Sequence, residues 1–213
     1  MSERERLIDE LVHDLRPVRR PGRIVALLGI WLVVSWGLVV GLVLADAPLR
    51  PDVAEQLRTS PRFLLETLLG LGAGALAMGA ALRLGIPSPG NWLGRAGPAW
   101  ALLFVWVGAY LYGLSSPSLE PSMLGKREGC YLQVLFFGLP PLVLGLVMMR
   151  RLASFDRWAS GALVGAAAGA IPGLLMQAGC MYVPEHILTH HIAPIGALAV
   201  VGAIAGSIAL RRP

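Results

Sequence analysis

The stretch IVALLGIWLVVSWGLVVGLVL, residues 24–44, contains no charged side chain over 21 residues. A membrane-spanning helix needs about 20 predominantly apolar residues, so this stretch is long enough to cross a bilayer. It is also longer than the apolar core of a signal peptide, which has about 7–15 residues. We therefore interpret residues 24–44 as a retained transmembrane helix, although the following Ala45-Asp46-Ala47 resembles a cleavage site.

Five further apolar stretches have similar lengths, and together they predict six transmembrane helices. The predicted spans are residues 24–44, 63–84, 98–114, 130–149, 159–182 and 192–210. Of the 213 residues, 55% are apolar and only 15% are charged, whereas a soluble domain has about 25% charged residues. The predicted fold is therefore all-α, a polytopic membrane bundle, and this composition excludes a water-soluble enzyme or nucleic-acid-binding domain.

The distribution of Lys and Arg indicates the orientation of the bundle. Thirteen of the 18 basic residues lie before the first span, in the second and fourth loops, and after the last span. Cytoplasmic loops of membrane proteins carry the excess of basic residues, so we predict that both termini are cytoplasmic. Glu66 and Arg83 lie near the ends of the second span, where we expect their side chains to reach the membrane interface.

Glycines recur at intervals of four residues in several spans. The fifth span has the longest series, and three other spans have pairs: Gly161, Gly165, Gly169 and Gly173 in the fifth, Gly37 and Gly41 in the first, Gly70 and Gly74 in the second, and Gly202 and Gly206 in the sixth. Small residues let helix backbones approach closely in lipid, so these glycines predict tight helix packing. The sequence contains no phosphate-binding loop, zinc-protease motif or serine nucleophile motif, and we therefore predict that the protein is not an enzyme.

A short amphipathic helix is predicted before the first span, within the sequence ERERLIDELVHDL of residues 3–15. Its apolar residues recur at helical spacing and form one stripe: Leu7, Ile8, Leu11, Val12 and Leu15. The polar positions are mainly acidic, whereas a membrane-surface helix is usually basic. We favour a helix that lays its stripe into a groove of a basic protein partner. An incidental solvated helix and a lipid-bound helix are the alternatives.

Both cysteines of the chain are predicted to lie on the outer side of the membrane. Cys130 begins the fourth span, and Cys180 lies near the end of the fifth. The following sequence, CMYVPEHILTHH, contains three of the four histidines of the protein, among them His186 and His190.

These residue types suit either redox or metal chemistry. Thiolates and imidazoles are the usual ligands of zinc-like ions, and a tetrahedral set would consist of Cys130, Cys180, His186 and His190. The two thiols would also be able to form a disulfide in an oxidising compartment. The sequence leaves open a redox-responsive or metal-responsive pair, a structural disulfide, and two buried cysteines without a functional role.

The sequence LIDELVHDLRPVRRP, residues 7–21, followed by six spans, resembles the membrane anti-sigma factors of the NrsF type. This resemblance implies that an extracytoplasmic-function (ECF) sigma factor is held at the bacterial inner (cytoplasmic) membrane by the N-terminal segment. Residues 1–22 would then be the cytoplasmic sigma-binding segment and residues 23–213 a transmembrane sensor domain. The implied sigma-binding residues are Leu7, Ile8, Asp9, Leu11, Leu15 and Arg16.

The resemblance also implies a role for the cysteines. The family carries a cysteine pair at the outer ends of its fourth and fifth helices, and this pair takes part in signal response. The matching positions in this chain are Cys130, Cys180, Pro184 and His190.

The predicted function is that of an anti-sigma factor that makes no direct contact with nucleic acid. Oxidant or heavy metal at the cysteine pair would change the packing of the fourth and fifth helices, where Pro140, Pro141 and Pro172 are points at which a bend can change. That change would release the sigma factor. The alternative is a small metal-handling membrane transporter or sensor that uses the outer cysteine and histidine cluster.

Overall fold

The computed structural model describes residues 3–13, 24–86, 91–152, 154 and 156–210. Within these ranges the chain is helical, and β-type pairing is confined to one isolated bridge between Ser122 and Tyr182. The predicted all-α class is confirmed. The predicted boundary between residues 22 and 23 lies outside the described residues.

The described residues form six segments that are long and apolar enough to cross a membrane, as predicted. Five of these segments are α2 (Ile24–Asp46), α4 (Pro61–Leu84), α5 (Trp92–Gly113), α6 (Cys130–Met149) and α7 (Arg157–Gly179). The sixth consists of α8 (Pro184–His186), the π-helix η1 (Ile187–Ile192) and α9 (Ala193–Ala209). The chain also forms two shorter helices, α1 (Glu3–His13) and α3 (Val53–Thr59).

The observed boundaries differ most from the predicted ones at two helix starts. Helix α5 begins six residues earlier than predicted, because the Asn91 side chain caps it by accepting a hydrogen bond from the backbone N–H of Gly94 at 2.9 Å. The sixth segment begins eight residues earlier, at Pro184, a residue type that suits the first turn of a helix. The second difference matters most, because it makes the histidine-containing segment helical.

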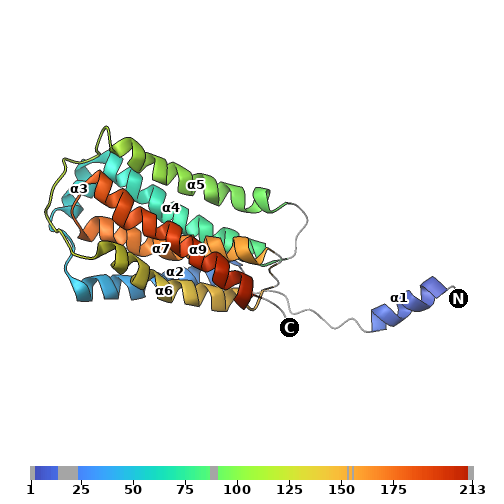
Figure 1. Ribbon diagram of the computed structural model, residues 1–213. Coiled ribbons are helices and arrows are strands. Elements are labelled where there is room, and N and C mark those ends of the chain that lie inside the picture. Colours follow the sequence, from blue (N-terminus) through green and yellow to red (C-terminus); the bar gives the residue numbers. More distant parts are fainter. Residues whose placement is uncertain (1–2, 14–23, 87–90, 153, 155, 211–213) are drawn as a thin grey trace.

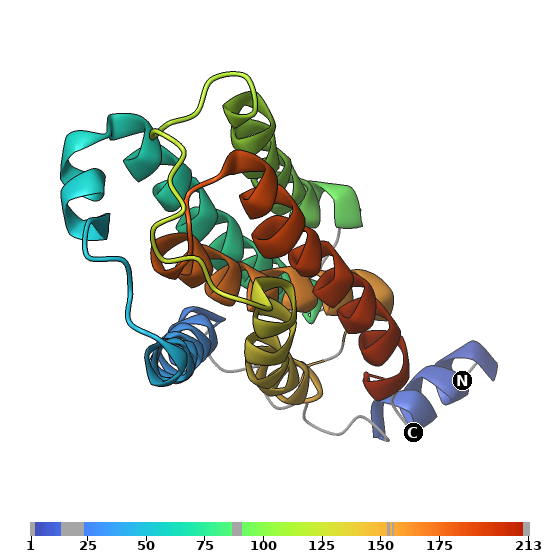
Figure 2. The ribbon, with the colours of Figure 1, turned by 60° about the vertical axis from the view of Figure 1, so that its left-hand side comes forward.

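Helix α7 lies at the centre of the bundle, with α2, α4, α6 and α9 packed around it (Figures 1 and 2). In the most hydrophobic 18-residue window of each segment, 94% of the residues of α7 are buried, against 22–50% in the other five. A helix surrounded by other helices contacts protein rather than lipid, and this explains why α7 is composed largely of Ala and Gly.

The glycines of α7 and α9 allow these two backbones to touch. A Cβ on Gly161 would overlap the carbonyl oxygen of Gly202, and a Cβ on Gly165 would overlap the carbonyl oxygen of Leu198. The tight packing predicted from the four-residue glycine spacing is confirmed for this pair of helices. It is not confirmed for α2, where a Cβ on Gly37 or Gly41 would meet nothing within 4 Å.

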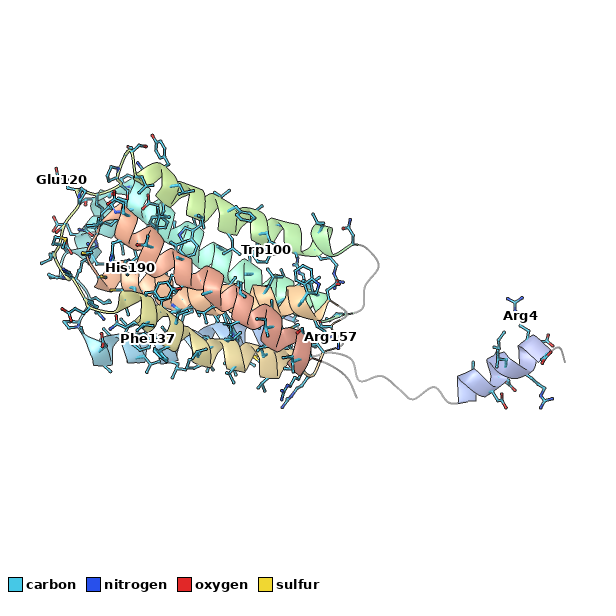
Figure 3. The ribbon with its side chains drawn as sticks, in the orientation of Figure 1. Arg4, Trp100, Glu120, Phe137, Arg157 and His190 are labelled. Carbon is cyan, nitrogen blue, oxygen red and sulfur yellow. The ribbon has the colours of Figure 1, made fainter. Side chains whose placement is uncertain are left out.

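The two ends of the bundle carry different elements. Helix α3 and residues 114–129 lie at one end, which we call the α3 end; α2 begins and α9 ends at the opposite end (Figure 1). Figure 3 shows His190 and Glu120 at the α3 end and Arg157 at the opposite end. The cysteines and three of the histidines are therefore gathered at the α3 end.

Candidate functional site

Two cysteines 50 residues apart in sequence meet at the α3 end, with their Sγ atoms 3.1 Å apart. Cys130 is the first residue of α6, which starts after Gly129 in the left-handed conformation (φ +79°). Cys180 follows the last residue of α7 in extended backbone. Both are buried, and both are free thiols. The two helix ends thus bring the thiols within hydrogen-bonding distance of each other.

Two histidines complete a cluster with these thiols. Nε2 of His186 lies 3.4 Å from Sγ of Cys180, and the His191 ring meets the His186 ring edge to face, with centroids 5.1 Å apart. One ligand atom from each of Cys130, Cys180, His186 and His191 lies within 4.8 Å of the other three. We call these four residues the Cys/His site.

His191 occupies the place in this cluster that was predicted for His190, so that prediction is corrected. His190 is exposed, stacks on His186 with ring centroids 4.3 Å apart, and hydrogen-bonds Thr189 Oγ1 through Nδ1. The prediction placed His186 and His190, four residues apart, in a loop before the sixth span. Residues 187–192 form a π-helix instead, in which residues five apart also lie near each other. Both His190 and His191 contact His186, but only His191 turns inward toward the buried thiols.

Arg127 joins the site to neighbouring helix ends. Its guanidinium donates hydrogen bonds to the carbonyl oxygens of Gly179, Ala47 and Pro48 and forms an ion pair with Asp46 at 3.1 Å. The Cys130 thiol points to the backbone carbonyl of Arg127 at 3.5 Å. In the sequence Arg127 is recognisable only as a loop charge, because nothing local signals its contacts with residues about 50 and 80 positions away.

A second arginine, Arg50, is buried close to Cys180. Its backbone N–H donates to the carbonyl oxygen of Ala178 at 3.1 Å, and its side chain donates to Gln56 at 2.6 Å. Burial lowers the pKa of the Arg50 guanidinium. The hydrogen bond from the Cys130 thiol lowers the pKa of the Cys180 thiol, because it stabilises the thiolate form. The site therefore combines a buried thiol of lowered pKa with a nearby buried arginine.

A second cluster of polar side chains, centred on Glu66, lies beside the Cys/His site. The Ser118 hydroxyl donates to the Glu66 carboxylate at 2.8 Å and also hydrogen-bonds the Tyr182 hydroxyl. Arg62 pairs with Glu66 at 3.4 Å. Glu66 is only 1% exposed, so the prediction that it reaches the membrane interface is wrong. The hydrogen bond from Ser118 to one carboxylate oxygen and the ion pair with Arg62 offset part of the cost of burial.

Helix α1 presents its apolar stripe to solvent. Leu7, Ile8 and Val12 are each more than half exposed, and Asp9 is exposed as well. The side chain of Leu11 and the whole of Leu15 and Arg16 lie outside the described part of the chain. The predicted amphipathic helix is therefore present over Glu3–His13, and its described apolar side chains are uncovered.

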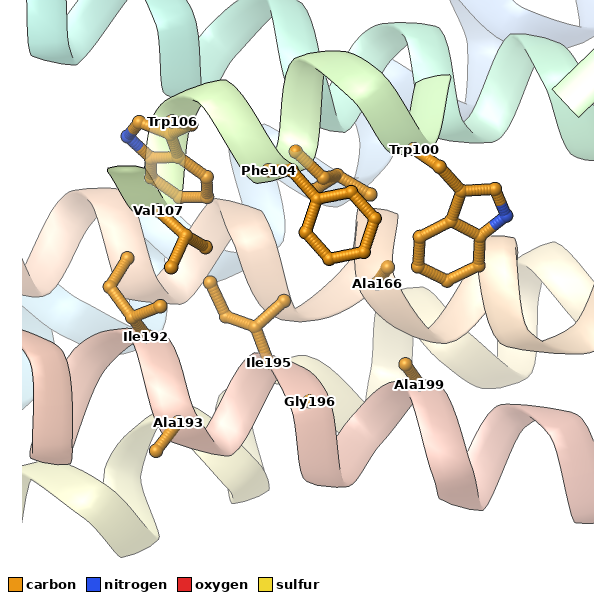
Figure 4. A pocket seen from close by; sticks show the side chains of 11 residues that line it. Trp100, Phe104, Trp106, Val107, Ala166, Ile192, Ala193, Ile195, Gly196 and Ala199 are labelled. Atoms are coloured by element: carbon orange, nitrogen blue, oxygen red, sulfur yellow. The ribbon is translucent and has the colours of Figure 1, made fainter. Parts of the chain in front are cut away.

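An apolar pocket of about 230 Å³ opens between α5, α7 and the η1–α9 segment. Figure 4 shows Trp100, Phe104, Trp106, Ile192 and Ile195 around it. Its lining residues include no ionisable side chain. Such a lining suits hydrocarbon rather than a polar ligand, so the chemistry of the described chain is concentrated in the Cys/His site.

A family model described as NrsF, negative regulator of sigma F, matches residues 11–211. The match begins inside α1 and ends just after α9, so it includes the six apolar segments and the Cys/His site. No curated protein and no solved structure matches the chain.

Proposed function

Because this chain belongs to the NrsF family of negative regulators of sigma F, it regulates a sigma factor negatively, and we propose that it does so by holding the sigma factor on α1. The observation that carries the proposal is the uncovered stripe of Leu7, Ile8 and Val12 on an otherwise charged helix. An amphipathic helix with such a stripe binds by laying its apolar face into a groove of its partner.

The proposed partner is a sigma factor of the ECF class. The polar side of α1 carries Glu3, Glu5, Asp9 and Glu10 against Arg4 and Arg6. A sigma factor exposes basic surface intended for DNA, and an acidic helix complements that surface. Leu11, Leu15 and the polar Asp9 and Arg16 would extend the same contact, as the family resemblance implies.

We propose that the protein resides in the bacterial inner membrane with both termini in the cytoplasm. The excess of Arg in the segments at the opposite end from α3, such as Arg150 and Arg151, supports this orientation. The Cys/His site, at the α3 end, would then face the periplasm, where oxidation of thiols is chemically allowed.

The signal in this proposal is an oxidant that acts on Cys130 and Cys180. With hydrogen peroxide, the two thiols give up two protons and two electrons, an S–S bond forms, the O–O bond breaks, and two water molecules leave. The 3.1 Å separation of the sulfur atoms supports this step, because little movement is needed to join them. One thiol with a lowered pKa supplies the nucleophile.

A hydrogen bond supports a route from the cysteines to the N-terminal segment. Trp31 of α2 is fully buried and donates from Nε1 to the carbonyl oxygen of Pro141 in α6 at 3.0 Å. Pro140 and Pro141 remove backbone donors from α6 and leave it easier to bend. A disulfide at the start of α6 would shift this helix against α2, which directly follows the proposed sigma-binding segment.

The transporter alternative has weaker support. Residues 161–176 of α7, the helix at the centre of the bundle, are all apolar, Gly or Pro. A metal crossing the membrane needs polar groups along its path, and the central helix does not supply them between Ser160 and Gln177.

The test is capture of the sigma factor by the full-length protein solubilised in mild detergent. The variant Ile8→Gln places a polar group on the stripe, and Arg6→Gln, on the opposite face of the same helix, is the matched control. Gln is a good helix former, so both variants keep α1. We expect wild type and Arg6→Gln to capture the sigma factor equally well. Ile8→Gln should capture at least tenfold less of it. Equal capture by both variants would overturn the proposal.

A further inference from the structure

We propose that Cys130, Cys180, His186 and His191 form a four-coordinate site for one divalent cation of the zinc class. The four residues come from the start of α6, the end of α7, α8 and η1, and their ligand atoms lie within 4.8 Å of one another. The proposal that the site binds a cation is based on this geometry. The proposal that cation binding acts as a signal rests on the proposed function.

The distances suit a tetrahedral ion. With bonds of about 2.3 Å to sulfur and about 2.0–2.1 Å to nitrogen, such an ion holds its ligand atoms roughly 3.3–3.8 Å apart. The two sulfur atoms lie 3.1 Å apart, and Sγ of Cys180 lies 3.4 Å from Nε2 of His186. Small side-chain movements therefore convert the empty cluster into a bound one.

His191 supplies an independent indication of a ligand. Its side chain is 0% exposed, and neither ring nitrogen makes a well-formed hydrogen bond, although the ring faces the Cys180 thiol. A buried polar group without a partner costs about 1–3 kcal/mol, so native structures seldom keep one without a reason. A cation bound between the cysteines and His186 would supply the missing partner of one imidazole nitrogen.

The donor types select the class of cation. Sulfur and imidazole nitrogen suit zinc and softer ions, whereas magnesium and calcium require oxygen ligands. Two thiolates, two neutral imidazoles and one divalent cation sum to zero charge, which a buried site tolerates better than an isolated ion. Four protein ligands leave no open coordination position, so the site would be regulatory or structural rather than catalytic.

Cation binding and disulfide formation would compete for the same two sulfur atoms. Binding of the cation to the two thiols releases two protons. Peroxide acting on the loaded site would form the S–S bond, consume two protons, release the cation and yield two water molecules. The loaded and oxidised states are thus two alternative linkages between the first residue of α6 and the end of α7.

The experiment is zinc binding by the purified full-length protein in detergent, reduced and free of chelator. Stoichiometry is measured by elemental analysis and affinity by competition with a chromogenic chelator, for wild type and for the variants His191→Gln, His186→Gln and Cys130→Ser. His190→Gln is the matched control, since His190 neighbours His191 in sequence and stacks on His186 but contributes no ligand atom to the cluster. Circular dichroism and gel filtration verify that each variant is folded.

We expect one zinc ion per wild-type chain and the same from His190→Gln, with affinity at least tenfold weaker in the other three variants. Wild type prepared with peroxide should bind none. The proposed site would be overturned if reduced wild type bound no zinc. It would also be overturned if His190→Gln lost zinc binding while His191→Gln bound zinc as wild type does. Sigma capture from the same preparation separates the two proposals, because capture without zinc refutes only the metal site and zinc without capture refutes only the sigma-binding role.

Discussion

Nε of Arg127 donates a hydrogen bond to the carbonyl oxygen of Gly179, 3.1 Å away, immediately before Cys180. The last carbonyls of a helix lack partners within the helix, and Arg127 supplies one for α7. The same guanidinium holds the carbonyl oxygens of Ala47 and Pro48 after α2. One side chain therefore connects the ends of α2 and α7 beside the Cys/His site.

Replacement of this arginine tests that connection. Arg127→Gln leaves three backbone carbonyls without their charged donor, so we expect the free energy of unfolding to fall by about 1–3 kcal/mol. The measurement is thermal unfolding of the protein in detergent. Lys126→Gln removes a neighbouring charge from an exposed side chain and should change little. Equal unfolding temperatures for the two variants would show that Arg127 contributes no more than a surface charge.

The contact of α7 with α9 makes a second prediction about stability. A Cβ on Gly202 would overlap the carbonyl oxygen of Gly161, whereas a Cβ on Gly196 of the same helix meets nothing within 4 Å. Gly202→Ala should therefore force the helices apart and cost about 1–3 kcal/mol, while Gly196→Ala should be neutral or slightly stabilising because Ala favours helix. Unfolding in detergent compares the two, and an unaffected Gly202→Ala would argue against backbone contact.

Thiol labelling tests the oxidation step directly. The chain has two cysteines, so the reduced protein unfolded in denaturant should take two maleimide labels, counted by mass spectrometry. After peroxide treatment of the folded protein, we expect no label and full recovery of both by reductant. Cys130→Ser should keep one reactive thiol at low peroxide. Two labels on peroxide-treated wild type would mean that the close sulfur atoms do not form the proposed disulfide.

The bond between Trp31 and Pro141 makes a prediction about signal transfer. Trp31→Phe keeps an aromatic ring in the core but removes the Nε1–H donor to α6. We expect peroxide to oxidise the cysteines of this variant normally while release of the sigma factor falls at least several-fold. Trp36→Phe, in the same helix and only half-buried, is the control. Normal release from Trp31→Phe would exclude this bond from the route.

Local sequence properties were sufficient to predict the architecture. Six apolar stretches of sufficient length predict six helices in lipid, because every backbone donor and acceptor there must be satisfied within the helix. Glycine spacing predicted close helix packing, since the period of a helix places those residues on one face, but only the structure showed that α7 and α9 are the pair in backbone contact. The amphipathic pattern predicted α1 for the same reason.

The composition of the Cys/His site depended on contacts that sequence spacing does not contain. The meeting of Cys130 and Cys180 required two helix ends to coincide, and predicted topology placed both cysteines on one side of the membrane without giving a distance. Residues 187–192 form a π-helix that the sequence did not predict, and the inward turn of His191 rather than His190 became visible only with it. Arg127 and Arg50 have no local pattern that marks them as neighbours of the thiols.

Glu66 also shows the difference between what the local sequence predicts and what tertiary contacts decide. Its position near a helix end suggested an exposed carboxylate, but Ser118 and Arg62 hold it inside the protein. The sequence by itself determined which segments are helical and apolar, because hydropathy and periodicity are properties of neighbouring residues. Only the tertiary structure decided which polar side chains are buried together, because burial and partners depend on segments that are far apart along the chain.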